Sequence, residues 1–206
     1  MGEGSANQQE AARFLEIEHK FLVPHDFDPE PLFGQLHAWE PERTYTTEVD
    51  DTYYLLEGAP GIVYRHRLDA YLQQLTIKSL GGDNQSRTEV NLELSSEQGS
   101  QEEAVRAFLA PLGVLWSGTL HKSVQVFYFP DVEIVYYRAR YGGAEQACIE
   151  IEARAPSDID AGLTVLSNWE KRLGLDSRKR CPSSILELLI LPQLPANLRQ
   201  RLQKFL

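Results

Sequence analysis

The chain has 206 residues, of which 42% are hydrophobic, so it can bury a sizeable core, and disorder along its whole length is excluded. Its net charge of −10 argues against a general DNA or RNA binder but allows a small anionic ligand in a locally basic pocket. The two cysteines are too few for a disulfide scaffold, no secretory signal opens the chain, and no apolar run approaches the roughly 20 residues of a membrane helix. These features predict a cytoplasmic protein with no membrane and no nucleic-acid partner, and they leave its oligomeric state open.

Residues 1–11 are small and polar and predict a flexible leader, followed by a single domain over residues 12–206. Stretches with the composition of strands, separated by glycine-containing turns, then follow in chain order. They are Leu15–Val23, Arg43–Leu56, Gly61–Ala70, Gln73–Ser79, Ser86–Leu94, Gly118–Phe129, Val132–Arg140 and Gln146–Ala153. Helices are expected at Pro31–Trp39, Ser100–Leu112, Ser157–Leu173, Ser183–Leu191 and Leu198–Leu206. This order predicts an α+β fold, an eight-stranded antiparallel closed barrel with helices packed outside it.

Five of these strands share an unusual pattern, in which one face is apolar and the other carries charges at alternate positions. The charged positions are Glu16, Glu18 and Lys20, then Arg65 and Arg67, Lys78, Arg87 and Glu89, and finally Glu150 and Glu152. A charge run on one strand usually faces water, but five together favour a barrel with a charged lumen. The apolar faces would then form an outer wall covered by the helices that start near Ser100, Ser157 and Ser183.

A lumen of this kind needs charges of both signs, because burying an unpaired ion costs on the order of several kcal/mol. A polyphosphate that carries a divalent cation would satisfy both signs. Arginine and lysine form strong hydrogen bonds with phosphate oxygens, and glutamate carboxylates bind hard divalent metals. The sequence therefore predicts a small anionic polyphosphate as the partner and Mg²⁺ or Mn²⁺ as the cofactor.

The segment Glu16-Ile-Glu18-His-Lys20 resembles the Glu-x-Glu-x-Lys signature of the CYTH, or triphosphate tunnel metalloenzyme, superfamily. Three charges in five residues are a weak signal alone, but the other charged positions follow in the family's order. These are the Arg-x-Arg at positions 65 and 67, Lys78, the Arg-x-Glu at 87 and 89, and the Glu-x-Glu at 150 and 152. The resemblance covers about Phe14 to Leu191 and implies an eight-stranded antiparallel tunnel that binds a triphosphate with one or two divalent metals.

The resemblance also implies roles for individual residues. The implied phosphate contacts are Lys20, Arg65, Arg67, Lys78, Arg87 and Lys122. The implied metal ligands are Glu16, Glu18, Glu89, Glu150 and Glu152, and the catalytic set is Glu16, Glu18, Lys20, Glu150 and Glu152. The implied activity is metal-dependent hydrolysis of a triphosphate, with inorganic tripolyphosphate ranked ahead of thiamine triphosphate or a nucleotide.

The chain departs from the family pattern at four places. Asn91 replaces a second acidic residue after Glu89, and Val124 replaces the arginine of a Lys-x-Arg pair. Tyr137 occupies a strand where an acidic residue is expected, and Ile185 replaces the tyrosine of a Ser-Tyr pair. Two alternatives therefore stay open. One is a non-catalytic binder or sensor of polyphosphorylated ligands, and the other, ranked last because no nucleoside pocket is recognisable, is a class IV-type adenylate cyclase.

Overall fold

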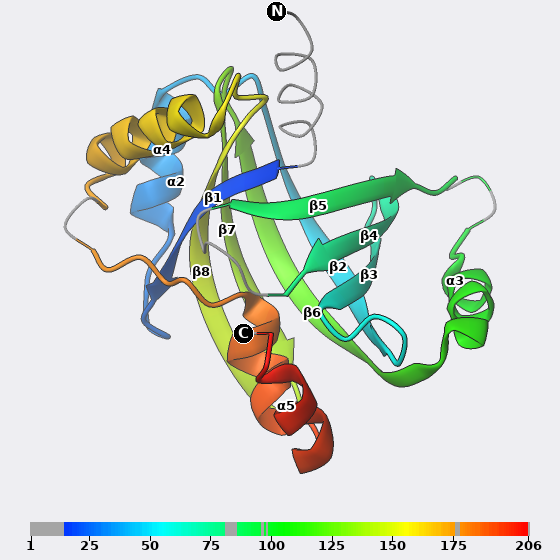
Figure 1. Ribbon diagram of the computed structural model, residues 1–206. Helices are drawn as coiled ribbons and strands as arrows, with labels where there is room; N and C mark the ends of the chain where they lie inside the picture. The colour runs from blue at the N-terminus through cyan, green and yellow to red at the C-terminus, as the bar shows by residue number, and fades with distance from the viewer. Residues whose placement is uncertain (1–14, 81–85, 96, 98, 176–177, 206) are drawn as a thin grey trace, which may run out of the picture.

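The computed structural model describes residues 15–80, 86–95, 97, 99–175 and 178–205, so the predicted leader at residues 1–11 lies outside the described part. Eight strands form one antiparallel, strongly curled sheet (Figure 1). They are β1 (Leu15–Val23), β2 (Arg43–Leu56), β3 (Ile62–Leu68), β4 (Gln73–Ser79), β5 (Ser86–Glu93), β6 (Val114–Tyr128), β7 (Val132–Tyr141) and β8 (Ala144–Ala153). Their order around the sheet is β1–β5–β4–β3–β2–β6–β7–β8, and β8 pairs again with β1.

The ring of strand pairings is complete, but its seam between β1 and β5 is short. Among the described residues, three residue pairs join these strands, from Leu15–Thr88 to Ile17–Ser86, whereas β1 pairs with β8 over the six residues that follow. The neighbouring β2–β6 ladder runs from Arg43–Tyr128 to Leu56–Val114. Because this seam is so short, the sheet is a strongly curled half-barrel whose edges meet at one end, and the predicted closed tunnel barrel is corrected accordingly.

Two helices cover the outer wall of β1, β7 and β8. These are α2 (Glu30–Ala38) and α4 (Ile159–Leu173), which lie on the same side of the sheet in Figure 1. Leu36 of α2 and Leu166 of α4 pack in one buried cluster with Ile17, Phe21 and Ile149 of the strands. Alternation along each strand puts these apolar side chains outside and the charged ones inside. The apolar face of these strands is therefore the outer face of the sheet.

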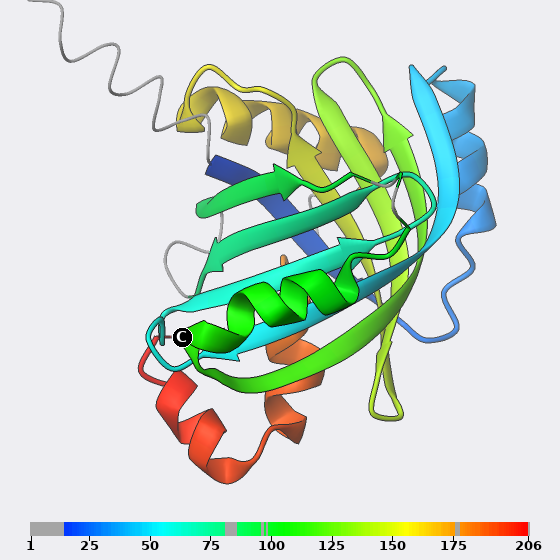
Figure 2. The ribbon, with the colours of Figure 1, turned by 90° about the vertical axis from the view of Figure 1, so that its right-hand side faces the viewer.

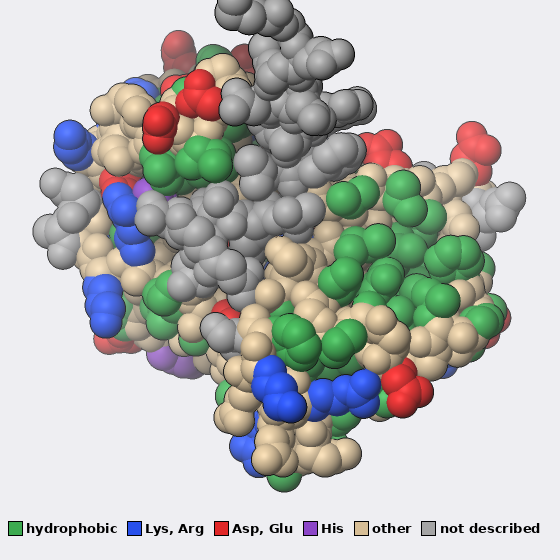
Figure 3. Space-filling view, viewed as in Figure 1, with side chains coloured by type: hydrophobic (Ala, Val, Ile, Leu, Met, Phe, Trp, Pro, Cys, Tyr) green, Lys and Arg blue, Asp and Glu red, His purple; other side chains and the backbone are tan. Residues whose placement is uncertain are grey.

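A third helix, α3 (Glu102–Leu109), crosses the outer wall formed by β2, β3 and β4 (Figure 2). Val105 and Leu109 of this helix pack against Tyr54 and Leu75 in a separate buried cluster. Beyond α3 no helix of the described residues covers this wall, and Figure 3 shows hydrophobic side chains gathered over β4 and β5. Leu92 in β5 is 55% exposed. The outer wall is thus apolar even where no helix of the described chain covers it.

The C-terminal segment does not lie on the outer wall, where the sequence placed it. It comprises a π-helical turn (Leu186–Ile190), a 3-10 turn (Leu191–Gln193) and α5 (Ala196–Leu202). Leu189 and Ile190 pack in one cluster with Leu120 and Ala139, which share the lumen-facing side of β6 and β7. The segment therefore closes one end of the lumen, because that end presents apolar side chains that need a cover.

A capping box fixes the start of this segment. The backbone N–H of Glu187 donates to the Ser184 hydroxyl at 3.2 Å, and the Ser184 N–H donates to the Glu187 carboxylate. Upstream, the Cys181 N–H donates to the Lys20 carbonyl at 2.7 Å, which ties the chain to β1. Within the described residues, no helix is both long enough and apolar enough to cross a membrane.

Candidate active site

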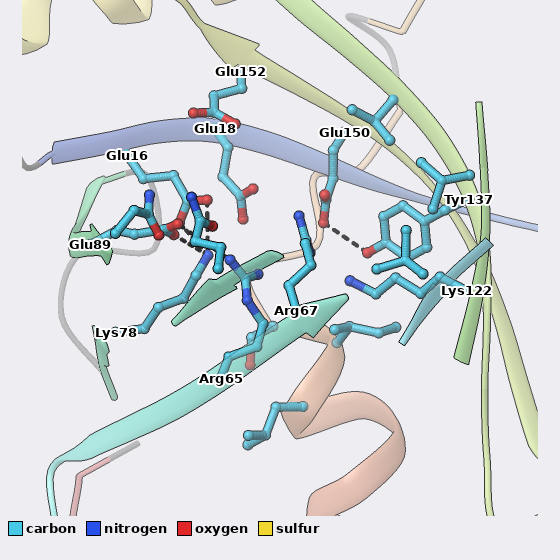
Figure 4. A pocket seen from close by; sticks show the side chains of 18 of the residues that line it. Glu16, Glu18, Arg65, Arg67, Lys78, Glu89, Lys122, Tyr137, Glu150 and Glu152 are labelled. Carbon is cyan, nitrogen blue, oxygen red and sulfur yellow. Dashed lines mark hydrogen bonds and ion pairs between the residues drawn. The ribbon is translucent and has the colours of Figure 1, made fainter. Parts of the chain in front are cut away.

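The curled sheet surrounds a cavity of about 290 Å³, and two contrasting sets of side chains line it (Figure 4). Five consecutive strands, β8, β1, β5, β4 and β3, contribute what we call the charged arc. It consists of Glu16, Glu18, Lys20, Arg65, Arg67, Lys78, Glu89, Glu150 and Glu152. The other three, β7, β6 and β2, contribute the valine arc, which consists of Val49, Val124, Val126 and Val135. The five strands of the charged arc are the five whose charged faces were predicted, and the other three strands add two charged residues to the lining, Lys122 and Glu133.

Lys20 is the centre of the first ionic group of the charged arc. Its ammonium lies 3.0 Å from Glu150 and 3.4 Å from Glu18, and it donates to the Ser183 carbonyl at 3.4 Å. The hydroxyl of Tyr137 donates to Glu150 at 2.7 Å. Although burial opposes ionisation, Lys20 and the nearby Lys122 lower the pKa of Glu150 to about 2. Glu150 is thus a fully ionised partner of two cations.

Lys78 is the centre of a second ionic group. Its ammonium donates to both carboxylate oxygens of Glu16 at 2.9 Å and forms an ion pair with Glu89. Glu89 also lies 3.4 Å from Arg65. Against the effect of burial, Lys78 and Arg65 lower the pKa of Glu89 to about 2. Glu89, like Glu150, is already engaged by cations.

The third group centres on Asp51, a residue that the sequence analysis missed. Its carboxylate accepts from Arg67 at 2.7 and 2.9 Å in a bidentate pair, and Lys122 lies 2.9 Å away. Arg65 lies 3.9 Å from the same carboxylate. These cations hold the pKa of Asp51 well below its usual range despite complete burial. The signal in the sequence was positional, because Asp51 alternates with the lumen-facing Val49 and Tyr53.

A row of carboxylates crosses three adjacent strands. Glu18 is opposite Glu152 in the β1–β8 ladder, and Glu152 is opposite Glu133 in the β7–β8 ladder. Directly opposed side chains lie about 4.5–5.5 Å apart at their Cβ atoms. Glu133 also lines the cavity and was not predicted, although it shares the lumen-facing side of β7 with Tyr137, where an acidic residue was expected.

Two acids in or near this row, Glu152 and Glu16, have raised pKa values, and a bound cation would favour their ionised forms. Burial, followed by the proximity of Glu16 and Glu133, raises the pKa of Glu152 well above its usual value. Burial also raises the pKa of Glu16 to about 7, an effect that Lys78 opposes and that Glu18 and Glu89 reinforce. Oxygen donors with an excess of negative charge fit Mg²⁺ or Mn²⁺. Within the described chain, however, no three such side chains are already gathered around one metal position.

The four departures from the family pattern also have defined positions. Val124 faces the lumen two residues from Lys122 and is 8% exposed, so the valine arc occupies the place of a cation. Asn91 lines the cavity and its side-chain oxygen accepts from the Thr76 hydroxyl at 2.7 Å. Tyr137 donates to Glu150, and Ile185 lines the cavity beside the C-terminal cover.

The structure brings most of the predicted site residues to one cavity. Those that line it are Glu16, Glu18, Lys20, Arg65, Arg67, Lys78, Glu89, Lys122, Glu150 and Glu152. Arg87 is opposite Glu16 in the β1–β5 ladder, but its side chain lies outside the described residues. A position beside the cavity does not show that a residue binds a ligand, so the roles of these residues stay predictions.

No known family model matches the chain, and no curated protein matches its sequence. Solved structures do resemble it. The PH1012 protein of Pyrococcus horikoshii OT3 has a TM-score of 0.67 at 21% identity, covering 84% of this chain and 99% of that one. A conserved hypothetical protein of Pyrococcus furiosus has a TM-score of 0.66 at 24% identity, with the same coverage of 84% and 99%.

A third similar structure is HpAC1 from Hippeastrum, a protein described with a dominant triphosphatase activity. Its TM-score is 0.55 at 14% identity, and the match covers 88% of this chain and 97% of that chain. All three identities are below 25%, so the likeness concerns the fold. The chain therefore shares its fold with these solved structures, in line with the resemblance noted for its sequence motifs.

Proposed function

We propose that this protein is a metal-dependent phosphohydrolase that binds and hydrolyses a triphosphate, with inorganic tripolyphosphate as the first candidate. The observation that carries the proposal is the convergence of five cations on one cavity that also holds an excess of carboxylates. The cations are Lys20, Arg65, Arg67, Lys78 and Lys122. Fixed cations in a partly dry cavity are suited to phosphate oxygens, whose charge increases at the leaving group during hydrolysis.

One atom of Arg65, its Nε, gives this proposal specific support. The Arg65 side chain is buried, and its Nε has no hydrogen-bond partner within the described residues. A buried donor without a partner is costly, and an acceptor supplied by a ligand would remove the cost. Arg65 already donates from Nη2 to Thr76 at 3.2 Å, which fixes its guanidinium group next to the cavity.

The size of the cavity favours a small ligand. Its volume of about 290 Å³ lies at the lower end of ligand pockets, which span roughly 300–1,000 Å³. The C-terminal segment and the valine arc occupy the rest of the lumen. The remaining cavity is therefore better suited to an inorganic chain of phosphates than to a nucleotide, which also carries a base and a sugar.

The metal would be held by carboxylates in and beside the row of opposed glutamates, where negative charge is in excess even though Lys78 contacts Glu16 and Lys20 contacts Glu18. Glu16, Glu18 and Glu152 are the candidates from the predicted set, with Glu133 as an addition. Glu89 and Glu150 are engaged with lysines and are better described as anchors for Lys78 and Lys20. When bound, the metal would neutralise phosphate charge and supply a hydrolytic water of lowered pKa.

The residues of the chain then have separable tasks. Arg67 and Lys122 would bind one end of the phosphate chain, and Lys78 would bind oxygens near Glu16. The C-terminal segment, which starts at Ser184, would exclude water from one end of the lumen. The dominant triphosphatase activity described for HpAC1 supports the same reaction class for this fold.

A second candidate is a binder of polyphosphorylated ligands that does not turn over. It is favoured by Val124, which puts an apolar side chain where a further cation is expected, and by Asn91, which is already bonded to Thr76. Both candidates require tripolyphosphate to bind, and they differ only in the release of phosphate.

The test is phosphate release from tripolyphosphate by purified protein with Mg²⁺, with Mn²⁺ and with a chelator. Arg67→Gln, purified in parallel, controls for contaminating phosphatase. Metal-dependent release that the variant loses supports the hydrolase. Binding by calorimetry without release selects the binder, and ATP as a second substrate tests for pyrophosphate release by a cyclase. A protein that neither binds nor releases phosphate would refute both candidates.

A further inference from the structure

Asp51 lies at the middle of β2 and has no solvent-exposed surface. It is opposite Arg67 in the β2–β3 ladder, and the two oxygens of its carboxylate each accept one N–H of that guanidinium, at 2.7 and 2.9 Å. On the other side of β2, Lys122 of β6 lies 2.9 Å from the same carboxylate. One buried anion is therefore shared by cations from both neighbouring strands.

The cations lie between this anion and the cavity. Arg65, Arg67 and Lys122 all line the cavity, whereas Asp51 is fully buried behind them. Three positive charges this close repel one another strongly where water is scarce. A single carboxylate reduces that repulsion and still leaves the group with an excess of positive charge for a ligand.

The geometry also restricts orientation. A bidentate pair fixes the plane of the Arg67 guanidinium, since Nε and Nη2 both donate to Asp51. Among the described residues, no further hydrogen bond engages Nη1 of Arg67 or the remaining protons of the Lys122 ammonium, so these donors can bind another acceptor. A side chain without this anchor would sample several rotamers and would lose entropy on binding a ligand.

We propose that Asp51 is a positioning residue, which contacts no ligand and fixes Arg67 and Lys122 as one phosphate-binding unit. Arg65 lies beside this unit, 3.9 Å from the Asp51 carboxylate, and is held by Thr76 and Glu89. This inference rests on the proposed binding of a triphosphate in the same cavity. It assigns a role to a residue outside the predicted phosphate and metal sets. It also separates the cations into a unit organised by Asp51 and two lysines, Lys20 and Lys78, that are organised by glutamates.

The test compares Asp51→Asn with Asp50→Asn. Asp50 is the adjacent residue on the outer face of β2, with an exposed side chain paired to His121, so it is a matched control for the loss of one carboxylate. Tripolyphosphate binding is measured by calorimetry in chelator. Asp51→Asn is expected to weaken binding by roughly ten-fold to a hundred-fold, since charge-assisted contacts lose their alignment. Asp50→Asn is expected to bind as the wild type does.

A double-mutant cycle with Lys122→Gln separates positioning from general structural support. If Asp51 acts through Lys122, the two losses of affinity are less than additive, whereas additive losses would overturn the inference. Unchanged binding by folded Asp51→Asn would also overturn it, because the carboxylate would then not be needed. Tighter binding would overturn it as well, because the carboxylate would then compete with the ligand for the cations. A wild type that binds no tripolyphosphate would refute the proposed function and the inference together.

Asp51→Glu is the second variant if Asp51→Asn does not fold. It keeps the negative charge but extends the side chain by one methylene group, which displaces the carboxylate towards the cations. We expect a folded protein with weaker tripolyphosphate binding and a melting temperature closer to that of the wild type. Wild-type affinity in Asp51→Glu would show that charge alone is sufficient and would overturn the positioning role.

Discussion

The charged arc and the valine arc are built by the same strand alternation yet differ in chemistry and in what they stabilise. In the charged arc, Lys78 and Glu16 hold one another inside the cavity at 2.9 Å. In the valine arc, Val126 is 2% exposed and packs in the cluster that includes the C-terminal segment. The first is suited to a ligand, and the second contributes core.

This difference teaches that alternation determines which residues face inward but not how the interior is divided. Burying ion pairs contributes little to net stability, because desolvation offsets the attraction between the charges. Burial of apolar surface stabilises by about 25 cal/mol per Å². A barrel that holds nine charged side chains in one arc therefore depends on apolar packing in the other.

Glu152→Gln tests the charged arc and is expected to have the largest effect. The Glu152 side chain makes no hydrogen bond within the described residues, so the substitution removes the charge that we propose binds the metal without breaking a pair. Metal-dependent phosphate release should fall about a hundredfold to a thousandfold. The melting temperature in chelator should stay the same or rise.

The control is Glu48→Gln, a carboxylate on the outer face of β2 that accepts from Ser123 at 2.9 Å. It should leave phosphate release unchanged. Full activity in Glu152→Gln would remove this residue from the metal site.

Ile190→Ala tests the valine arc and the C-terminal cover. Ile190 has no exposed surface, and its truncation should lower the free energy of unfolding by about 2 to 4 kcal/mol through the cavity it leaves. Chemical denaturation measures this loss. Ile159→Ala, at a side chain 42% exposed, should cost only about 0.5 kcal/mol. Equal losses in the two variants would show that the cover is not part of the core.

The pH dependence of stability sharpens the comparison, because Glu16, Glu89 and Glu150 of the charged arc have shifted pKa values, whereas the valine side chains do not titrate. The pKa of Glu16 is about 7 in the folded protein against an ordinary 4.5, so the folded state holds a proton that the unfolded state releases between these values. Its contribution to stability in chelator should therefore fall as the pH rises from about 4.5 to about 7. Glu89 and Glu150, with pKa values of about 2, act in the opposite direction as the pH falls below about 4.5.

Melting temperatures of the wild type and Glu16→Gln, measured in chelator from about pH 5 to about pH 8, check this expectation. The variant should show a shallower decrease with pH. A decrease of the same slope in both proteins would assign the titration to another group.

Val124→Thr is expected to have the smallest effect and marks the border between the two arcs. The substitution keeps the shape of the side chain but buries a hydroxyl, at a cost of about 1 kcal/mol. Tripolyphosphate affinity should stay within about twofold of the wild type, since Val124 belongs to the apolar packing. A larger change in the Kd would place Val124 in contact with the ligand.

Much of the fold was predictable, because its signals are local. The alternation in LEIEHKFLV and CIEIEA placed β1 and β8 with their charged faces inward. The helix expected at Ser157–Leu173 matches α4, whose N-cap is Asp158 and whose C-cap is Gly174. The predicted strand at Gly118–Phe129 was too short, since β6 begins at Val114. There, Trp116 and the residues beside it pair with β2, a long-range contact that no local pattern contains.

The site was predictable only in part, for a similar reason. The family motifs identified charged residues that line the cavity, but not Asp51 or Glu133, which belong to no quoted motif. The helical pattern after Ser183 was recognised as a helix, but its location was wrong. An apolar helix packs equally well on an outer wall or on a lumen end, and the decision depends on which surface is uncovered.

The sequence by itself determined the strands, the inward direction of their charges and the mixture of signs, because these follow from a period of two residues. Only the tertiary structure decided the partner of each charge. The contact between Lys78 and Glu16 spans 62 residues, and Lys20 contacts Glu150 across the β1–β8 ladder. Register between distant strands sets such contacts, and with them the division of the lumen into a charged arc and a valine arc.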